Sequence, residues 1–298
     1  MNPLMDVAGL KARLADHRRT VLLDVRWALG DPYGYRHYLQ EHLPGAVFVD
    51  LQTELAAPAV PERGRHPLPA AEDFEAGARR WGINDRDVVV AYDDSGNMAA
   101  ARVWWMLRNA GLAEVYLLDG GLAAWRAAGL PLEAGPVVPD PGGVHLMNGK
   151  MPAIDAAAAA AWPDAGLLLD ARAGERYRGE FEPIDPRAGH IPGAISAPTS
   201  ENVDGSGRFL ASAALRRRFE SMGVRDGVQV AVYCGSGVTA AHEVAALEIA
   251  GFPAALYPGS FSEWSNSPDL PVATGAEPGR GSGGPGGTTP PGKGSVAS

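Results

Sequence analysis

The stretch VQVAVYCGSGVTAAHEVAALEIA, residues 228–250, predicts a buried strand, a short glycine-containing loop and a helix. Three valines at alternating positions open it, a pattern typical of a strand covered on both faces of a parallel sheet. Residues 239–250 then have the composition and apolar spacing of a helix, and Gly251 supplies a stop signal. Strand, loop and helix in this order indicate an α/β fold.

Cys234 lies where the predicted strand becomes the loop, and it is the single cysteine among 298 residues. It therefore cannot close an intramolecular disulfide, and it is either an inert buried thiol or a reactive one. The loop GSGV at 235–238 contains two glycines, which permit backbone angles that turn successive N–H groups inward. Because such a nest at a helix N-terminus stabilises an anion, the loop favours a reactive thiolate.

The motif CGSGVTA after a strand resembles the active-site loop of the rhodanese superfamily, and specifically that of 3-mercaptopyruvate sulfurtransferases. The resemblance implies that Cys234 is the nucleophile and carries the transferred sulfur as a persulfide. It also implies that Ser236 relays a proton to the departing enolate of pyruvate. The other loop residues implied to bind substrate are Gly235, Gly237, Val238 and Thr239.

The chain also repeats itself at a distance of about 140 to 150 residues, which predicts a duplicated domain and not a solenoid. The matching segments are LLDVR (22–26) and LLDAR (168–172), HLPGA (42–46) and HIPGA (190–194), WGINDRDVVVAYDDSG (81–96) and MGVRDGVQVAVYCGSG (222–237), and DGGLAAW (119–125) and PGSFSEW (258–264). Each copy alternates short apolar runs with helical stretches. We therefore expect two tandem rhodanese-like domains, each a mainly parallel sheet flanked by helices.

Composition shifts give the expected domain division. Between the copies the chain is rich in proline and glycine, and its last part has no aromatic residue and is dominated by Gly, Pro, Ser and Thr. The division is an N-terminal domain at 1–132, a linker at 133–152, a C-terminal catalytic domain at 153–274 and a disordered tail at 275–298. In the first copy, strands are predicted at 21–24, 47–48, 88–92 and 115–118, and helices near 6–16, 71–81, 99–110 and 121–128.

Comparison of the two copies assigns the chemistry to the second. Asp93 stands opposite Cys234, whereas Ser95 and Gly96 match Ser236 and Gly237. A carboxylate is a poor acceptor for sulfane sulfur, so the first copy has the loop without the nucleophile. This matches the two-domain rhodanese pattern, in which the N-terminal domain lacks the catalytic cysteine.

Arg178 and Arg187 lie nine residues apart in a polar segment rich in proline and glycine, which we expect to be a surface loop beside the active face. Two converging arginines would hold the carboxylate of a small 2-oxo acid. The resemblance implies this role for both, and the alternative is that they pair with nearby acidic residues. The loop after Cys234 is neutral, which favours 3-mercaptopyruvate over the thiosulfate dianion as the sulfur donor.

His66 resembles a first-domain histidine that reaches across the interface towards the loop serine; the alternative is an isolated surface histidine. The family's third member is an acid, but Gln52 stands at the best-matching position and Asp50 lies two residues earlier. A Ser-His-Asp relay is therefore in doubt. His42 and His190, in the repeated turns, are expected to be structural.

The formal net charge of −9 argues against partners such as nucleic acid or an anionic membrane. No apolar leader and no charge-free apolar segment of membrane-spanning length is present, so we expect a cytoplasmic protein. Because two domains already supply an interface, we expect a monomer. The sequence contains no dinucleotide fingerprint, phosphate-binding loop or metal-ligand cluster, so no cofactor and no metal are expected. The expected partners are a small-molecule sulfur donor and an acceptor such as cyanide, a low-molecular-weight thiol or thioredoxin.

The sequence has three alternatives to a 3-mercaptopyruvate sulfurtransferase. A cysteine phosphatase would need an arginine six residues after the cysteine, where this chain has Ala240, and is excluded. A thiosulfate:cyanide sulfurtransferase and a persulfide carrier or sensor without turnover remain open.

Overall fold

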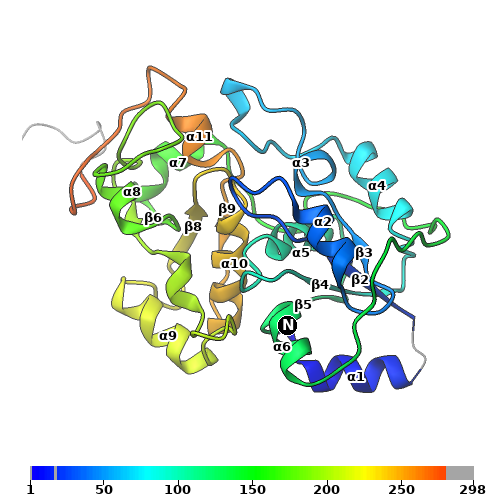
Figure 1. Cartoon of the computed structure of the whole chain (residues 1–298). Helices are drawn as coiled ribbons and strands as arrows, with labels where there is room; N and C mark the ends of the chain where they lie inside the picture. The colour runs from blue at the N-terminus through cyan, green and yellow to red at the C-terminus, as the bar shows by residue number, and fades with distance from the viewer. Residues whose placement is uncertain (1, 17–18, 280–298) are drawn as a thin grey trace, which may run out of the picture.

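The computed structural model describes residues 2–16 and 19–279, and these form two parallel β-sheets (Figure 1). The first has the strand order β1-β5-β4-β2-β3 and the second the order β7-β6-β8-β9. The strands are β1 (Leu4–Met5), β2 (Thr20–Asp24), β3 (Val47–Phe48), β4 (Val88–Tyr92), β5 (Val115–Leu118), β6 (Gly166–Asp170), β7 (Ile195–Ser196), β8 (Gln229–Tyr233) and β9 (Ala255–Leu256). The expectation of two α/β domains with parallel sheets is confirmed.

Helices join successive strands, as a parallel sheet requires. In the first copy they are α1 (Val7–Ala15), α2 (Gly34–Gln40), α3 (Leu51–Glu54), the 3-10 helix η1 (Pro61–Arg63), α4 (Ala71–Arg80), α5 (Ala100–Asn109) and α6 (Gly121–Ala127). In the second copy they are α7 (Ala156–Ala161), η2 (Trp162–Asp164), α8 (Gly174–Arg178), η3 (Thr199–Asn202), α9 (Ser212–Ser221), α10 (Thr239–Ala250) and α11 (Ser260–Trp264). The elements predicted for the first copy and for residues 228–250 agree with these to within one or two residues.

The duplication is visible in the strand pairing. The series β3-β2-β4-β5 of the first sheet corresponds to β7-β6-β8-β9 of the second. Even β1, which pairs with β5, has a counterpart in the parallel bridge between Ala153 and Leu256. Each copy therefore places the loop after its central strand, β4 or β8, at the same edge of its sheet.

Helices α5 and α10 pack against each other between the two sheets (Figure 1). A single apolar cluster joins both helices to residues of both sheets. Every residue from 240 to 247 is buried, as expected for a helix surrounded by protein. The loops that precede these two helices therefore lie at the contact between the copies.

The segment between the copies, 133–152, has no helix or strand and runs over the first copy. Its backbone hydrogen-bonds to His42, Asn109 and Ala110. Most of the tail expected to be disordered, from residue 280 onward, lies outside the described residues, while Gly275 and Pro278 hydrogen-bond to the second copy. Among the described residues, no helix is long and apolar enough to cross a membrane.

Candidate active site

Cys234 is buried at the carboxyl end of β8, directly before the loop that leads into α10. The backbone N–H of Gly237 donates to its Sγ at 3.1 Å. The backbone N–H of Cys234 itself donates to Ser260 Oγ at 3.1 Å, and Ser260 has a φ of 55°. A non-glycine residue in this left-handed region is strained and persists where the surrounding structure fixes it. The sulfur is thus held in a rigid loop with a hydrogen-bond donor directed at it.

Gly237 is a position where the loop needs glycine. Its φ is 76°, and a Cβ there would lie 2.2 Å from the carbonyl oxygen of Pro258. Any other residue would move the loop away from Pro258 and would displace the N–H that points at the sulfur.

Two residues of the first copy, Arg65 and His66, reach this site from the loop after η1. Gly64 allows the close approach, because a Cβ at this residue would lie 2.6 Å from Ser262 Oγ in α11. His66 Nδ1 lies 2.8 Å from Ser236 Oγ. The structure therefore brings together the serine and histidine that the sequence analysis singled out, across the contact between the two copies.

Burial lowers the pKa of His66 to about 4, and the positive charges of Arg102 and Arg65 act in the same direction. The imidazole is therefore neutral at neutral pH. A neutral imidazole hydrogen-bonded to a hydroxyl can exchange a proton with it, which is the requirement for a proton relay.

The candidate acid of this relay, Asp50, is not bonded to the histidine. Asp50 is the N-cap of α3, and its Oδ1 accepts the backbone N–H groups of Gln52 and Thr53 at 2.8 and 3.3 Å. Across the described part of the chain, the His66 ring hydrogen-bonds to Ser236 and to no carboxylate. The observed arrangement is a serine-histidine pair.

A cavity of about 400 Å³ opens at Cys234 between the copies. It is lined by Trp27, Leu29, Arg65 and Met98 of the first copy and by Ala171, Arg172, Ala173, Arg176, Thr199, Ser200, Cys234, Gly235, Ser236, Val238 and Thr239 of the second. Gly237 does not line the cavity, but its N–H donates to the sulfur of Cys234. The expected loop residues thus surround one space together with three arginines.

Two of these arginines have a free nitrogen directed at the loop. Arg65 Nη2 and Arg176 Nη1 lie 3.0 and 3.3 Å from the position that a Cβ on Gly235 would take. Within the described residues neither nitrogen has a hydrogen-bond partner, because both side chains use other nitrogens to bind Asp185, and Arg176 also binds Glu182. Two guanidinium groups therefore converge, with donors unused, beside Cys234.

The expected pair Arg178 and Arg187 is not brought to the cavity, and this expectation is corrected. Arg178 ends the one-turn helix α8 and pairs with Glu180 at the surface. Residues two apart on a helix face different directions, so Arg176 faces the site while Arg178 faces away. Arg187 donates to the carbonyls of residues 264, 265, 267 and 270 at 2.7 to 2.8 Å, which makes it a structural residue.

The paired histidines of the repeated turns are structural, as expected. His42 stacks on Tyr38 and bonds to two carbonyl oxygens, while His190 stacks on Tyr177 and bonds to its carbonyl. Both are fully buried and lie outside the lining of the cavity.

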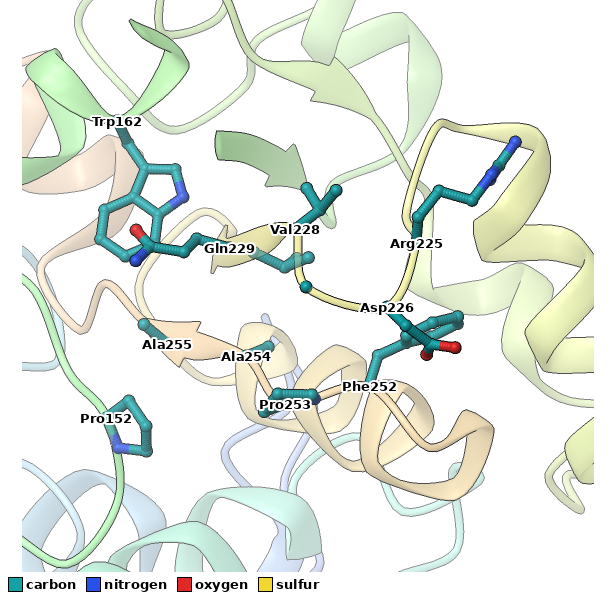
Figure 2. Close-up of a pocket in the computed structure, with 12 residues that line it drawn as sticks. Pro152, Trp162, Arg225, Asp226, Val228, Gln229, Phe252, Pro253, Ala254 and Ala255 are labelled. Atoms are coloured by element: carbon teal, nitrogen blue, oxygen red, sulfur yellow. The ribbon is translucent and has the colours of Figure 1, made fainter. Parts of the chain in front are cut away.

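Another pocket, of about 340 Å³, lies at the amino ends of β8 and β9 (Figure 2). Trp162, Pro152 and residues 225–230 and 252–255 line it. Ligands of parallel α/β sheets bind at the carboxyl ends of the strands, and this pocket has neither the cysteine nor a histidine. It is not the candidate active site.

Known proteins resemble this chain over most of its length. The family model for the rhodanese-like domain matches residues 6–128 and 155–267. A Pseudomonas aeruginosa protein named as a 3-mercaptopyruvate sulfurtransferase is 48% identical over 279 residues, which cover 91% of this chain and 98% of that protein. A Mycobacterium tuberculosis protein named as the thiosulfate sulfurtransferase SseB is also 48% identical, over 85% of this chain and 90% of its own length. The crystal structure of the 3-mercaptopyruvate sulfotransferase SseA from Escherichia coli matches with a TM-score of 0.78 and 31% identity, covering 87% of this chain and 99% of that one.

Sequence reasoning missed Arg65 and Arg176 as residues of the site. Arg65 precedes His66, so its place next to an implied site residue was a usable signal. Arg176 lies two residues before Arg178, where the sequence predicted a surface loop and no helix, so no helical spacing was available to choose between the two.

Proposed function

This chain belongs to the rhodanese family and is a sulfurtransferase with two rhodanese-like domains, and from this premise we propose that it transfers sulfane sulfur from 3-mercaptopyruvate through a persulfide on Cys234. The observation that carries the proposal is the pair of unused guanidinium nitrogens, on Arg65 and Arg176, above Gly235. A small 2-oxo acid has one carboxylate to bind there, while its sulfur reaches the neighbouring cysteine.

In the first half-reaction the Cys234 thiolate attacks the sulfur of the donor. A sulfur–sulfur bond forms, the carbon–sulfur bond breaks, and its electron pair leaves on the enolate of pyruvate. The enolate then takes up one proton to give pyruvate. The N–H of Gly237, 3.1 Å from Sγ, supports the negative charge on sulfur before and after the transfer.

Ser236 and His66 are proposed to supply the proton. The short contact between Ser236 Oγ and His66 Nδ1 and the neutral state of the imidazole support this role. The relay needs no carboxylate, because the neutral imidazole can accept the hydroxyl proton or pass one on.

In the second half-reaction a nucleophile attacks the outer sulfur and restores the Cys234 thiolate. Cyanide would give thiocyanate, and a low-molecular-weight thiol or thioredoxin would give a new persulfide or a disulfide with release of sulfide. We also propose a thiol acceptor, a monomeric state and a cytoplasmic location. The proposed domain boundaries lie at residues 132, 152 and 274.

A thiosulfate donor is the second candidate, because one relative with 48% identity is named for it. The neutral loop residues Gly235 and Ser236 favour the monoanionic 2-oxo acid over a dianion.

The test is the intact mass of the protein after incubation with 3-mercaptopyruvate and no acceptor. An increase of about 32 Da that disappears on addition of cyanide, and that the Cys234→Ser variant does not show, is the expected result. Unchanged mass in the wild-type protein, with pyruvate still released, would contradict the proposal.

A further inference from the structure

Arg102 is a fully buried cation on α5 of the first copy, which lacks the cysteine. Among the described residues, all of its hydrogen bonds go to backbone carbonyl oxygens. Nη1 donates to Gly237 at 3.0 Å, and Nη2 donates to His66 at 2.8 Å and to Leu55 at 3.2 Å. One side chain thus ties the histidine-bearing loop of the first copy to the cysteine loop of the second.

This cation differs from the arginines that line the cavity, each of which has a carboxylate partner. Those pairs are Arg65 with Asp185, Arg172 with Asp170, and Arg176 with Glu182 and Asp185. A buried charge without a counter-ion is costly. Burial lowers the pKa of Arg102 to about 10, and the charge of Cys234 opposes this effect. Cys234 is thus the acidic group that acts on the charge of Arg102, and Gly237 links the two residues by hydrogen bonds.

The hydrogen bonds show how Arg102 also fixes the loop. Gly237 donates its N–H to Cys234 Sγ, and its carbonyl accepts from Arg102. This glycine has a φ of 76°, a left-handed conformation that other residues rarely adopt. The N–H and the carbonyl of Gly237 belong to the two peptide units on either side of its Cα, so a hydrogen bond to each unit restrains the backbone of this glycine from both sides.

The central helix of the second copy makes an equivalent contact with the loop of the first copy, but through an uncharged side chain. His242 of α10 bonds through Nε2 to the carbonyl of Gly96 at 3.1 Å, and Gly96 is the counterpart of Gly237. Burial lowers the pKa of His242 to about 3, so this side chain is neutral. Each central helix therefore binds the loop of the other copy, and the charged side chain faces the loop that contains the cysteine.

We propose that Arg102 is a positioning residue and the counter-cation of Cys234: it holds Gly237 so that the N–H is directed at the sulfur, and it balances the negative charge there. This inference rests on the proposed function for its kinetic part. The first copy thus contributes to sulfur chemistry through a residue that does not contact the substrate.

The experiment compares the full-length Arg102→Met and Arg102→Lys variants with the wild-type protein and with Arg108→Met. Arg108 is a matched control, because it lies on the same helix and pairs across the same contact with Glu248, at 3.6 Å. Two quantities are measured: the rate of alkylation of Cys234 by iodoacetamide between pH 5 and 9, and kcat and KM for 3-mercaptopyruvate with cyanide as acceptor. Alkylation requires no sulfur donor, so it tests the inference even if the proposed donor is wrong.

In Arg102→Met we expect alkylation to require a higher pH, and kcat to fall by about 10- to 100-fold with KM within about threefold. Arg102→Lys keeps the charge, so its alkylation profile stays near that of the wild type while kcat falls because Gly237 is held less firmly. Arg108→Met changes neither quantity.

Wild-type alkylation in a folded Arg102→Met protein would overturn the counter-cation role, as would an equal change in Arg108→Met. If Arg102→Met does not fold, Arg102→Lys decides the positioning role, because a wild-type kcat in this variant would overturn it. Failure of the wild-type protein to transfer sulfur, with the alkylation difference intact, would reject the proposed function alone.

Discussion

Asp93 and Cys234 occupy the same position in the two copies, each at the carboxyl end of the central strand and each receiving N–H groups of the loop that follows. The Asp93 carboxylate accepts the N–H groups of residues 95, 97, 99 and 100 at 2.7 to 3.0 Å. The Cys234 sulfur accepts the N–H of Gly237 at 3.1 Å. In the first copy, the Asp93 carboxylate therefore binds the N–H groups of its own loop. In the second copy, the reactive sulfur of Cys234 stands at the same position.

Replacing Asp93 by Asn should lower stability without affecting the chemistry. Each carboxylate oxygen accepts two N–H groups, and the amide nitrogen of Asn can accept none, so two N–H groups lose their partner and the free energy of unfolding falls by about 2 kcal/mol. Urea unfolding measures this loss, and Asp94→Asn, an exposed neighbour, is the control. A fall in kcat/KM of more than a few-fold in the folded Asp93 variant would show that the first loop takes part in the reaction.

Arg176→Gln should raise KM for 3-mercaptopyruvate by about 10- to 100-fold, because one charged donor to the substrate carboxylate is lost. Arg178→Gln, two residues along the same helix, should leave KM within about twofold of the wild type. Steady-state kinetics with cyanide as acceptor compare the two. If Arg178→Gln shows the larger effect, the carboxylate site is assigned to the wrong face of α8.

Ser236→Ala and His66→Gln should each lower kcat while KM for the donor changes little, since neither removes a guanidinium group from the site. Proton transfer by a positioned group contributes about 100- to 10,000-fold, and water replaces part of it, so a loss of about 10- to 100-fold is expected. The double variant should be no slower than the slower single variant. Full additivity of the two losses would show that the serine and the histidine act separately.

The buried histidines make stability depend on pH. The pKa of His242 is lowered from 6.5 to about 3 and that of His66 from 6.5 to about 4, so the unfolded chain binds more protons than the folded one below pH 6.5. The contribution of the two neutral histidines to the free energy of unfolding is therefore complete above pH 6.5. It is lost as the pH falls from 6.5 towards their folded-state pKa values of about 3 and about 4.

The loss is about 1.4 kcal/mol per pH unit for each histidine in the middle of its window. Urea unfolding at pH 7 and pH 5 measures it. His242→Gln should reduce the difference between the two pH values by the share of one histidine. An unchanged pH dependence in His242→Gln would contradict the neutral buried state of this residue.

The fold could be predicted from the sequence because the signals for strands, loops and helices are local and occur in both copies. The apolar strands, the loop glycines and the helix around Cys234 are fixed by neighbouring residues, and the match between the copies showed that Asp93 replaces the nucleophile. His66 came from the resemblance, and the structure places it against Ser236.

The arginines could not be assigned from sequence because their roles depend on direction and on the contact between the copies. Arg176 and Arg178 differ only in which side of one helical turn they face. Arg187 stands at a suitable spacing but is held by four carbonyl groups of the chain before residue 271. Arg102 lies in a helical pattern that gives no hint of its contact with Gly237, 135 residues further along the chain.

The most direct test of the central claim is a comparison of donors. Sulfur transfer to cyanide is measured from 3-mercaptopyruvate and from thiosulfate, each over a concentration series, with Cys234→Ser as the control. We predict a higher kcat/KM for 3-mercaptopyruvate and no transfer from either donor in the Cys234→Ser variant. A higher kcat/KM for thiosulfate, or transfer that survives the loss of Cys234, would contradict the account.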